Sequence, residues 1–129
     1  MAHELYECLP GAVAEKDLST KQYYIVEISG DGPQVDVCDG AGDLPIGVLQ
    51  NKPNAAGKAA EVAVSGICKV ISDGTAAIAT GETVGTNATG MAIKKSTDAD
   101  FVLGTALSPS AASGTIITVL LTPGAQRAS

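Results

Sequence analysis

Tyr23-Tyr24-Ile25-Val26-Glu27-Ile28-Ser29 and Gln34-Val35-Asp36-Val37-Cys38 are the two stretches that decide the fold class of this chain. The first is rich in aromatic and β-branched residues, which favour strands. The second alternates apolar and polar residues strictly, which predicts a strand with one buried face and one wet face. Gly30-Asp31-Gly32-Pro33 lies between them and is a strong turn signal. The pattern therefore predicts a β-hairpin.

The same alternation of apolar runs and turn residues continues along the chain. Gly66 interrupts one long run and predicts a bulge or bend there rather than the end of a strand. Helix signals are weak, because neither 12–18 nor 108–112 carries an amphipathic stripe of useful length. About nine short strands separated by Gly-rich turns predict an all-β fold, either a compact small β-barrel or a β-sandwich. The further strands are expected over residues 46–50, 60–71, 75–79, 83–86, 91–93, 101–107 and 115–122.

The length of 129 residues is that of one domain. Residues 1–20 show no clear period and are expected to form an extended N-terminal arm. This arm is either strapped across its own domain or free to strap onto a neighbour. Residues 21–123 are expected to form the β domain, and the small, polar residues 124–129 a flexible C-terminal tail.

Composition and charge exclude several classes of protein. Apolar residues make up 45% of the chain, which is enough to form a core and argues against disorder. No apolar stretch approaches the roughly 20 residues that a membrane span needs, and no signal peptide is recognisable. The formal net charge is −6 and the basic residues are scattered, so binding to nucleic acid is not expected.

Residues that could carry chemistry are scarce. His3 is the only imidazole, so an enzyme would have to recruit it from the terminus as its base. Cys8, Cys38 and Cys68 form no Cys-x-x-Cys pair, which leaves a zinc site without ligands. We expect three reduced thiols, no catalytic residues, no metal and no cofactor.

Carboxylates in Gly-rich loops have two interpretations. Asp31, Asp36, Asp39 and Asp43 could offer oxygen ligands to a hard cation, but Asp is also frequent in turns because it hydrogen-bonds its own backbone. We favour turns, both here and at 96–100. A lipoyl- or biotinyl-type carrier would need a modifiable lysine at a hairpin tip, whereas Lys69 falls inside an expected strand.

A resemblance to a known family extends over most of the chain. The segments that carry it are Cys8–Gly11, Leu18–Tyr23, Pro45–Pro53, Gly57–Val70, Ile78–Thr86, Gly90–Ala92, Val102–Leu107 and Gly114–Leu121. Each segment is a strand-and-turn pattern of low specificity, and their order along the chain carries the likeness. Taken in this order, they resemble the small capsid cement, or head decoration, proteins of tailed bacteriophages.

The resemblance implies a protein without catalysis that coats the outer surface of the expanded head and clamps neighbouring major capsid subunits. It implies synthesis in the host bacterial cytoplasm. It also implies self-association, with a trimer favoured over a dimer, while other members of such families occur as dimers or monomers. Two alternatives stay open, namely another virion module of the tail or baseplate, and a small β-barrel carrier or ligand-binding domain.

Apolar residues near the N-terminus are the candidate contacts. Leu5, Tyr6 and Leu9 could anchor the arm on the capsid or on a neighbouring subunit. They could equally pack against the β domain of their own chain, and both interpretations stand at this point.

Overall fold

The computed structural model describes residues 5–29, 34–40, 45–74, 77–94, 102–110 and 115–121. These residues contain no helix, and hence none that is long and apolar enough to cross a membrane. They form a ten-stranded sheet, which confirms the expected all-β class. The strands follow an open path that is not closed into a barrel. The expected tail over residues 124–129 lies outside the described residues.

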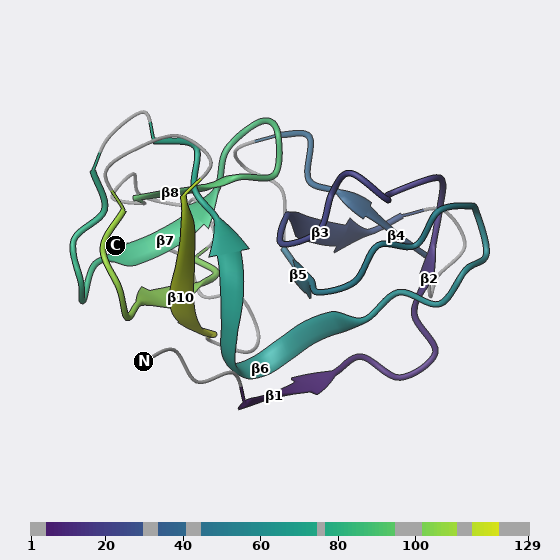
Figure 1. Ribbon diagram of the computed structural model, residues 1–129, viewed down its shortest axis with the longest axis horizontal. Coiled ribbons are helices and arrows are strands. Elements are labelled where there is room, and N and C mark those ends of the chain that lie inside the picture. Colours follow the sequence, from purple (N-terminus) through teal and green to yellow (C-terminus); the bar gives the residue numbers. More distant parts are fainter. Residues whose placement is uncertain are drawn as a thin grey trace.

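Nine of the strands lie side by side in the order β2-β4-β3-β5-β6-β10-β9-β7-β8, and β1 pairs with β6 off this path (Figure 1). The strands are β1 (Leu5–Cys8), β2 (Val13–Ala14), β3 (Ile25–Ile28), β4 (Gln34–Val37), β5 (Gly47–Leu49), β6 (Val62–Ile71), β7 (Thr83–Thr86), β8 (Ala92–Lys94), β9 (Gly104–Ala106) and β10 (Ile116–Leu121).

The predicted hairpin is confirmed in β3 and β4. These strands pair antiparallel, with Val26 opposite Val37 and Ile28 opposite Val35. Val26 and Val35 are completely buried, so one face of the hairpin lies on the core as the alternation predicts. The expected turn over residues 30–33 lies outside the described residues.

β6 is the longest strand and connects the two halves of the molecule. Its first part pairs with β5, where Ala63 lies opposite Val48. Its second part pairs with β10, from Gly66 opposite Leu121 to Ile71 opposite Ile116. Gly66 has a φ of 92°, which glycine adopts without the steric cost that a Cβ brings. The strand therefore bends at Gly66 without ending, as the sequence predicts (Figure 1).

The bend divides the sheet into two lobes. We call β2–β5 with the first part of β6 the first lobe, and β7–β10 with the second part of β6 the second lobe. Each lobe has its own cluster of buried residues. The cluster of the second lobe also takes in Ile25 and Val48 from the first lobe, so the two lobes share apolar contacts across the bend.

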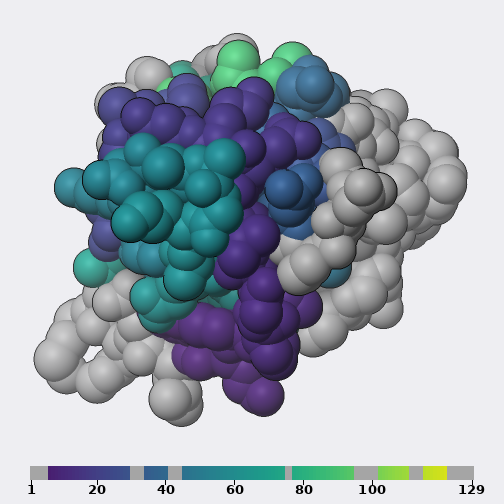
Figure 2. Space-filling view, turned by 90° about the vertical axis from the view of Figure 1, so that its right-hand side faces the viewer, coloured from purple at the N-terminus to yellow at the C-terminus, as the bar shows by residue number. Residues whose placement is uncertain are grey.

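The N-terminal segment is part of this sheet. β1 lies along the bend of β6, and β2 runs parallel to β4 with Val13 opposite Gln34. Leu18 is buried, and its backbone N–H donates to the carbonyl of Pro53 at 2.8 Å. Figure 2 shows the purple N-terminal segment crossing this end of the molecule beside the teal residues that precede β6. Residues 5–20 are thus strapped across their own domain.

One expected strand is wrong for the residues that the structure describes. Residues 77–79 of the expected strand 75–79 form only an isolated bridge between Ile78 and Ser110. Ile78 is buried and exchanges two backbone hydrogen bonds of 2.9 Å with Ser110, whereas Ala77 and Ala79 are exposed. Ile78 alone pairs this stretch with Ser110, and neither neighbour of Ile78 continues the pairing into a strand.

Candidate docking surface

The three residues singled out near the N-terminus lie on β1 or directly after it. The hydroxyl of Tyr6 donates to Glu61 Oε1 at 2.7 Å, and the Tyr6 ring is half-buried against the core of the second lobe. Leu9 is half-buried against the core of the first lobe. The backbone of Leu5 lies opposite Ile67, and the Leu5 side chain is outside what the structure describes. Tyr6 and Leu9 therefore contact their own domain, and a capsid contact through this segment stays a prediction.

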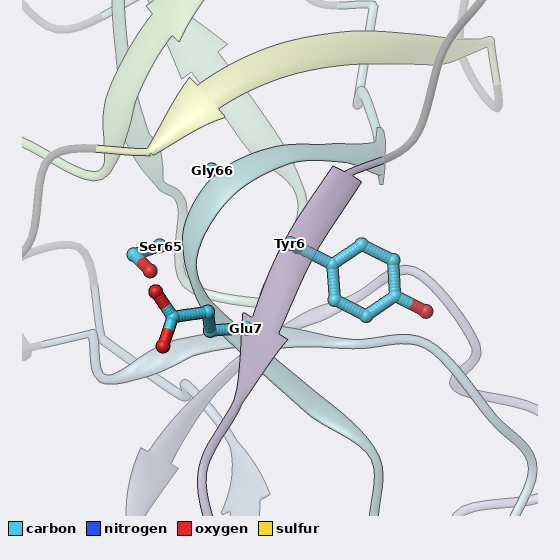
Figure 3. A pocket seen from close by; sticks show the side chains of 4 residues that line it. All are labelled: Tyr6, Glu7, Ser65 and Gly66. Carbon is cyan, nitrogen blue, oxygen red and sulfur yellow. The ribbon is translucent and has the colours of Figure 1, made fainter.

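A shallow, open depression of about 430 Å³ lies where β1 crosses the bend of β6. Tyr6, Glu7, Ser65 and Gly66 line it. In Figure 3 the Glu7 carboxylate and the Ser65 hydroxyl lie close together on one side of β1, and the Tyr6 ring points to the other side. A depression this open differs from the enclosed sites that bury most of a small ligand.

Cys8 is an exposed thiol next to a carboxylate. Its Sγ lies 3.8 Å from Glu61 Oε1. Partial burial and the negative charge of Glu61 both raise the pKa of Cys8 above its ordinary value. The thiol therefore stays protonated at neutral pH and is a poor nucleophile. Cys38 and Cys68 form no disulfide either, and both are buried.

Only part of the acidic loops falls within the described residues. Asp36 forms an ion pair with Lys16, with 2.9 Å between Oδ2 and Nζ, while Asp31 and Asp43 lie outside. The residues described include no group of three or more potential metal ligands. Lys69 lies within β6, and its Nζ is 5.9 Å from the centre of the Tyr23 ring.

The outer face of the second lobe is apolar. Four large hydrophobic side chains of the described residues are exposed, and three of them lie on this face: Leu107 (41%), Ile116 (41%) and Leu120 (45%). The fourth, Ile28 (46%), lies on β3 in the first lobe. Ile117, Val119 and Leu121 alternate with the exposed residues of β10 and are buried.

The strand register makes these side chains neighbours. Leu120 lies opposite Ile67 on β6, and Ile116 lies opposite Ile71, both half-buried. The backbone N–H of Leu107 donates to the carbonyl of Thr118 at 2.7 Å, which places Leu107 along the other edge of β10. Directly opposite residues of an antiparallel pair project to the same face. We call this surface, made of Ile67, Ile71, Leu107, Ile116 and Leu120, the β10 face.

The β10 face carries almost no charge. Lys69, which lies opposite Thr118, is the only charged residue in β9, β10 and the second part of β6. The whole chain, in contrast, has a formal net charge of −6. The sequence alone does not reveal this face. The strong apolar signal of residues 115–122 predicts a strand, but it does not tell which apolar side chains of that strand stay exposed.

Comparisons with known proteins point to one kind of protein. A family model described as phage cement protein matches residues 14–122, which is most of the chain. No curated protein sequence matches. Among solved structures, the N base of head fibre gp8.5 of bacteriophage phi29 is similar, with a TM-score of 0.65 and 15% sequence identity. The match covers 89% of this chain and 93% of that one, and at this identity it shows a shared fold.

Proposed function

The chain belongs to the phage cement protein family, and from this membership we propose that it binds the outer surface of the expanded head and holds neighbouring major capsid subunits together. It is a phage capsid decoration protein, and it is located on the virion capsid. The match of the family model over residues 14–122 is the observation that carries this conclusion.

The fold suits binding by fit to a repeating surface. The two lobes share a strand and apolar contacts, so the protein presents a rigid surface that loses little conformational freedom on binding. The contacts of each bound copy are modest, but many copies bound to one shell together increase its stability. A preference for the expanded head requires only that the docking site differ between the expanded shell and its precursor.

The proposal includes the absence of catalysis. Tyr6, Glu7 and Ser65 supply the polar side chains at the open depression, and none of them is an imidazole that could act as the base. The Tyr6 hydroxyl is bound to Glu61. The neighbouring thiol of Cys8 has a raised pKa, which disfavours the nucleophilic thiolate.

Self-association as a trimer, rather than a dimer, is a further part of the proposal. A trimer would present three identical docking surfaces at once, so the second and third contacts form at a high effective concentration. Synthesis in the host bacterial cytoplasm is consistent with three cysteines that form no disulfide, since a reducing compartment keeps thiols reduced. Sedimentation velocity of the purified protein measures the oligomeric state directly.

Binding to isolated shells tests the proposed function. Purified protein is mixed with undecorated expanded heads and, separately, with precursor shells, and co-sedimentation is measured over a range of protein concentrations. We expect saturable binding to the expanded heads and much weaker binding to the precursors. Equal binding to both would refute the preference, and binding to neither would refute the function.

The N-terminal segment is tested in the same assay. Deletion of residues 2–9 removes β1 with Leu5, Tyr6 and Leu9, so thermal unfolding of the shortened chain must be followed in parallel. If this segment contacts the capsid, occupancy falls at temperatures where the shortened chain is still folded. Undiminished occupancy would remove the segment from the docking mechanism.

A further inference from the structure

One face of the second lobe exposes three large apolar side chains to solvent. Single exposed hydrophobic residues are common on protein surfaces, but a contiguous group of them marks an interaction site. Leu107, Ile116 and Leu120 form such a group, because they lie on two adjacent strands or directly after one, and Ile67 and Ile71 continue it onto β6.

We propose that the β10 face is the surface through which the protein docks on the phage shell. This inference rests on the proposed function, and it names the part of the molecule that performs it. A decoration protein must bury some of its surface against the shell, and the centres of protein interfaces are depleted in charge and rich in apolar side chains. The β10 face has both properties.

Family membership makes the shell the occupant of the face, and the position of Lys69 disfavours a two-fold pair of copies there. A two-fold pairing centred on Thr118 would bring Lys69 towards its symmetry mate. A shell surface without a cation opposite Lys69 avoids this like-charge contact. The complementary partner is therefore a protein surface of the shell with an apolar centre.

The exposed part of each side chain sets the size of the expected effect. Burial of slightly less than half of a Leu or Ile side chain corresponds to about a five- to tenfold gain in affinity. Two such residues on one strand, Ile116 and Leu120, should together contribute about 50-fold if their effects are nearly additive.

The test replaces exposed apolar residues by threonine, which keeps a high preference for strands. Ile116→Thr and Leu120→Thr are made singly and together, flanking the native Thr118. Ile28→Thr is the matched control, since Ile28 is equally exposed and also on a strand but lies in the first lobe. Dissociation constants for expanded heads are measured by co-sedimentation, with thermal unfolding and sedimentation velocity for each variant.

We expect the dissociation constant to rise about five- to tenfold for each single variant and about 50-fold for the double variant. The Ile28→Thr control should stay within about twofold of the wild type. If the double variant does not fold, the single variants give the result.

Two results would overturn the inference. One is a folded double variant that binds expanded heads as tightly as the wild type does. The other is a variant that loses self-association but keeps its affinity for the shell, which would assign the face to contacts between copies. Failure of the wild type to bind any shell would instead count against the proposed function.

Discussion

Substitution of Gly104 by alanine should separate two strands of the second lobe. Gly104 lies in β9 between β7 and β10, opposite Val84 on one side and Leu121 on the other. A Cβ added at this position would overlap the carbonyl oxygen of Leu120, and it would lie 3.0 Å from the Leu120 carbonyl carbon and from Leu121 Cα. These are backbone atoms of a paired strand, so no side-chain rotation relieves the overlap.

The cost follows from this geometry. Overpacking lowers the free energy of unfolding by about 1–3 kcal/mol when side chains can adjust. Because the atoms around Gly104 are backbone atoms, Gly104→Ala should lower it by about 3 kcal/mol. For a domain of this length that corresponds to a melting temperature about 12 °C lower. Thermal unfolding followed by far-ultraviolet circular dichroism measures the difference.

Gly57 provides the matched control for this substitution. A Cβ at Gly57 would meet no atom within 4 Å, but its φ of 84° is unfavourable for alanine. Gly57→Ala should therefore cost only about 1 kcal/mol, through the backbone conformation alone. The steric reasoning would be refuted if Gly104→Ala lowered the melting temperature no more than Gly57→Ala does.

Two further predictions concern titratable groups. Hydrogen bonds from Lys94 Nζ (2.6 Å) and from the backbone N–H of Ala79 (2.7 Å) hold the pKa of Glu82 below its ordinary value of 4.5. The ionised Glu82 side chain therefore stabilises the fold above pH 4.5, and this stabilisation is lost as the pH falls through the lowered pKa. Glu82→Gln should therefore melt below the wild type at pH 7, and the gap should close as the pH is lowered below 4.5; a gap that did not change with pH would contradict this. Because the Glu61 carboxylate raises the pKa of Cys8, Glu61→Gln should speed alkylation of this thiol at pH 8, and equal rates in the two proteins would show that Glu61 does not protect it.

The sequence predicts those parts of the fold whose signal is local. The hairpin of β3 and β4 follows from alternation on both sides of a turn, and the bend of β6 follows from Gly66 inside an apolar run. β1 is different, because it is four residues long and pairs Leu5 with Ile67, far away in the sequence. No alternation of apolar and polar residues predicts such a strand, because its stability comes from pairing with β6 and not from its own sequence pattern.

The candidate docking surface is only partly predictable for a related reason. β10 is apolar on both of its faces apart from Thr118, so its sequence shows a strong strand but not which face is buried. Exposure of Ile116 and Leu120 depends on how β10 pairs with β6 and β9. The sequence predicts that Tyr6 and Leu9 contact either the capsid, a neighbouring subunit or their own domain. Only the three-dimensional arrangement shows that both pack against their own core.

A strand that belongs to two halves at once has a thermodynamic consequence. β6 pairs with β5 on one side of Gly66 and with β10 on the other. Unfolding of either lobe therefore removes β6 as a hydrogen-bonding partner of the other lobe. The chain should therefore melt in a single cooperative transition, with no stable half-melted form. A copy bound to the shell should therefore keep both lobes folded or lose both together.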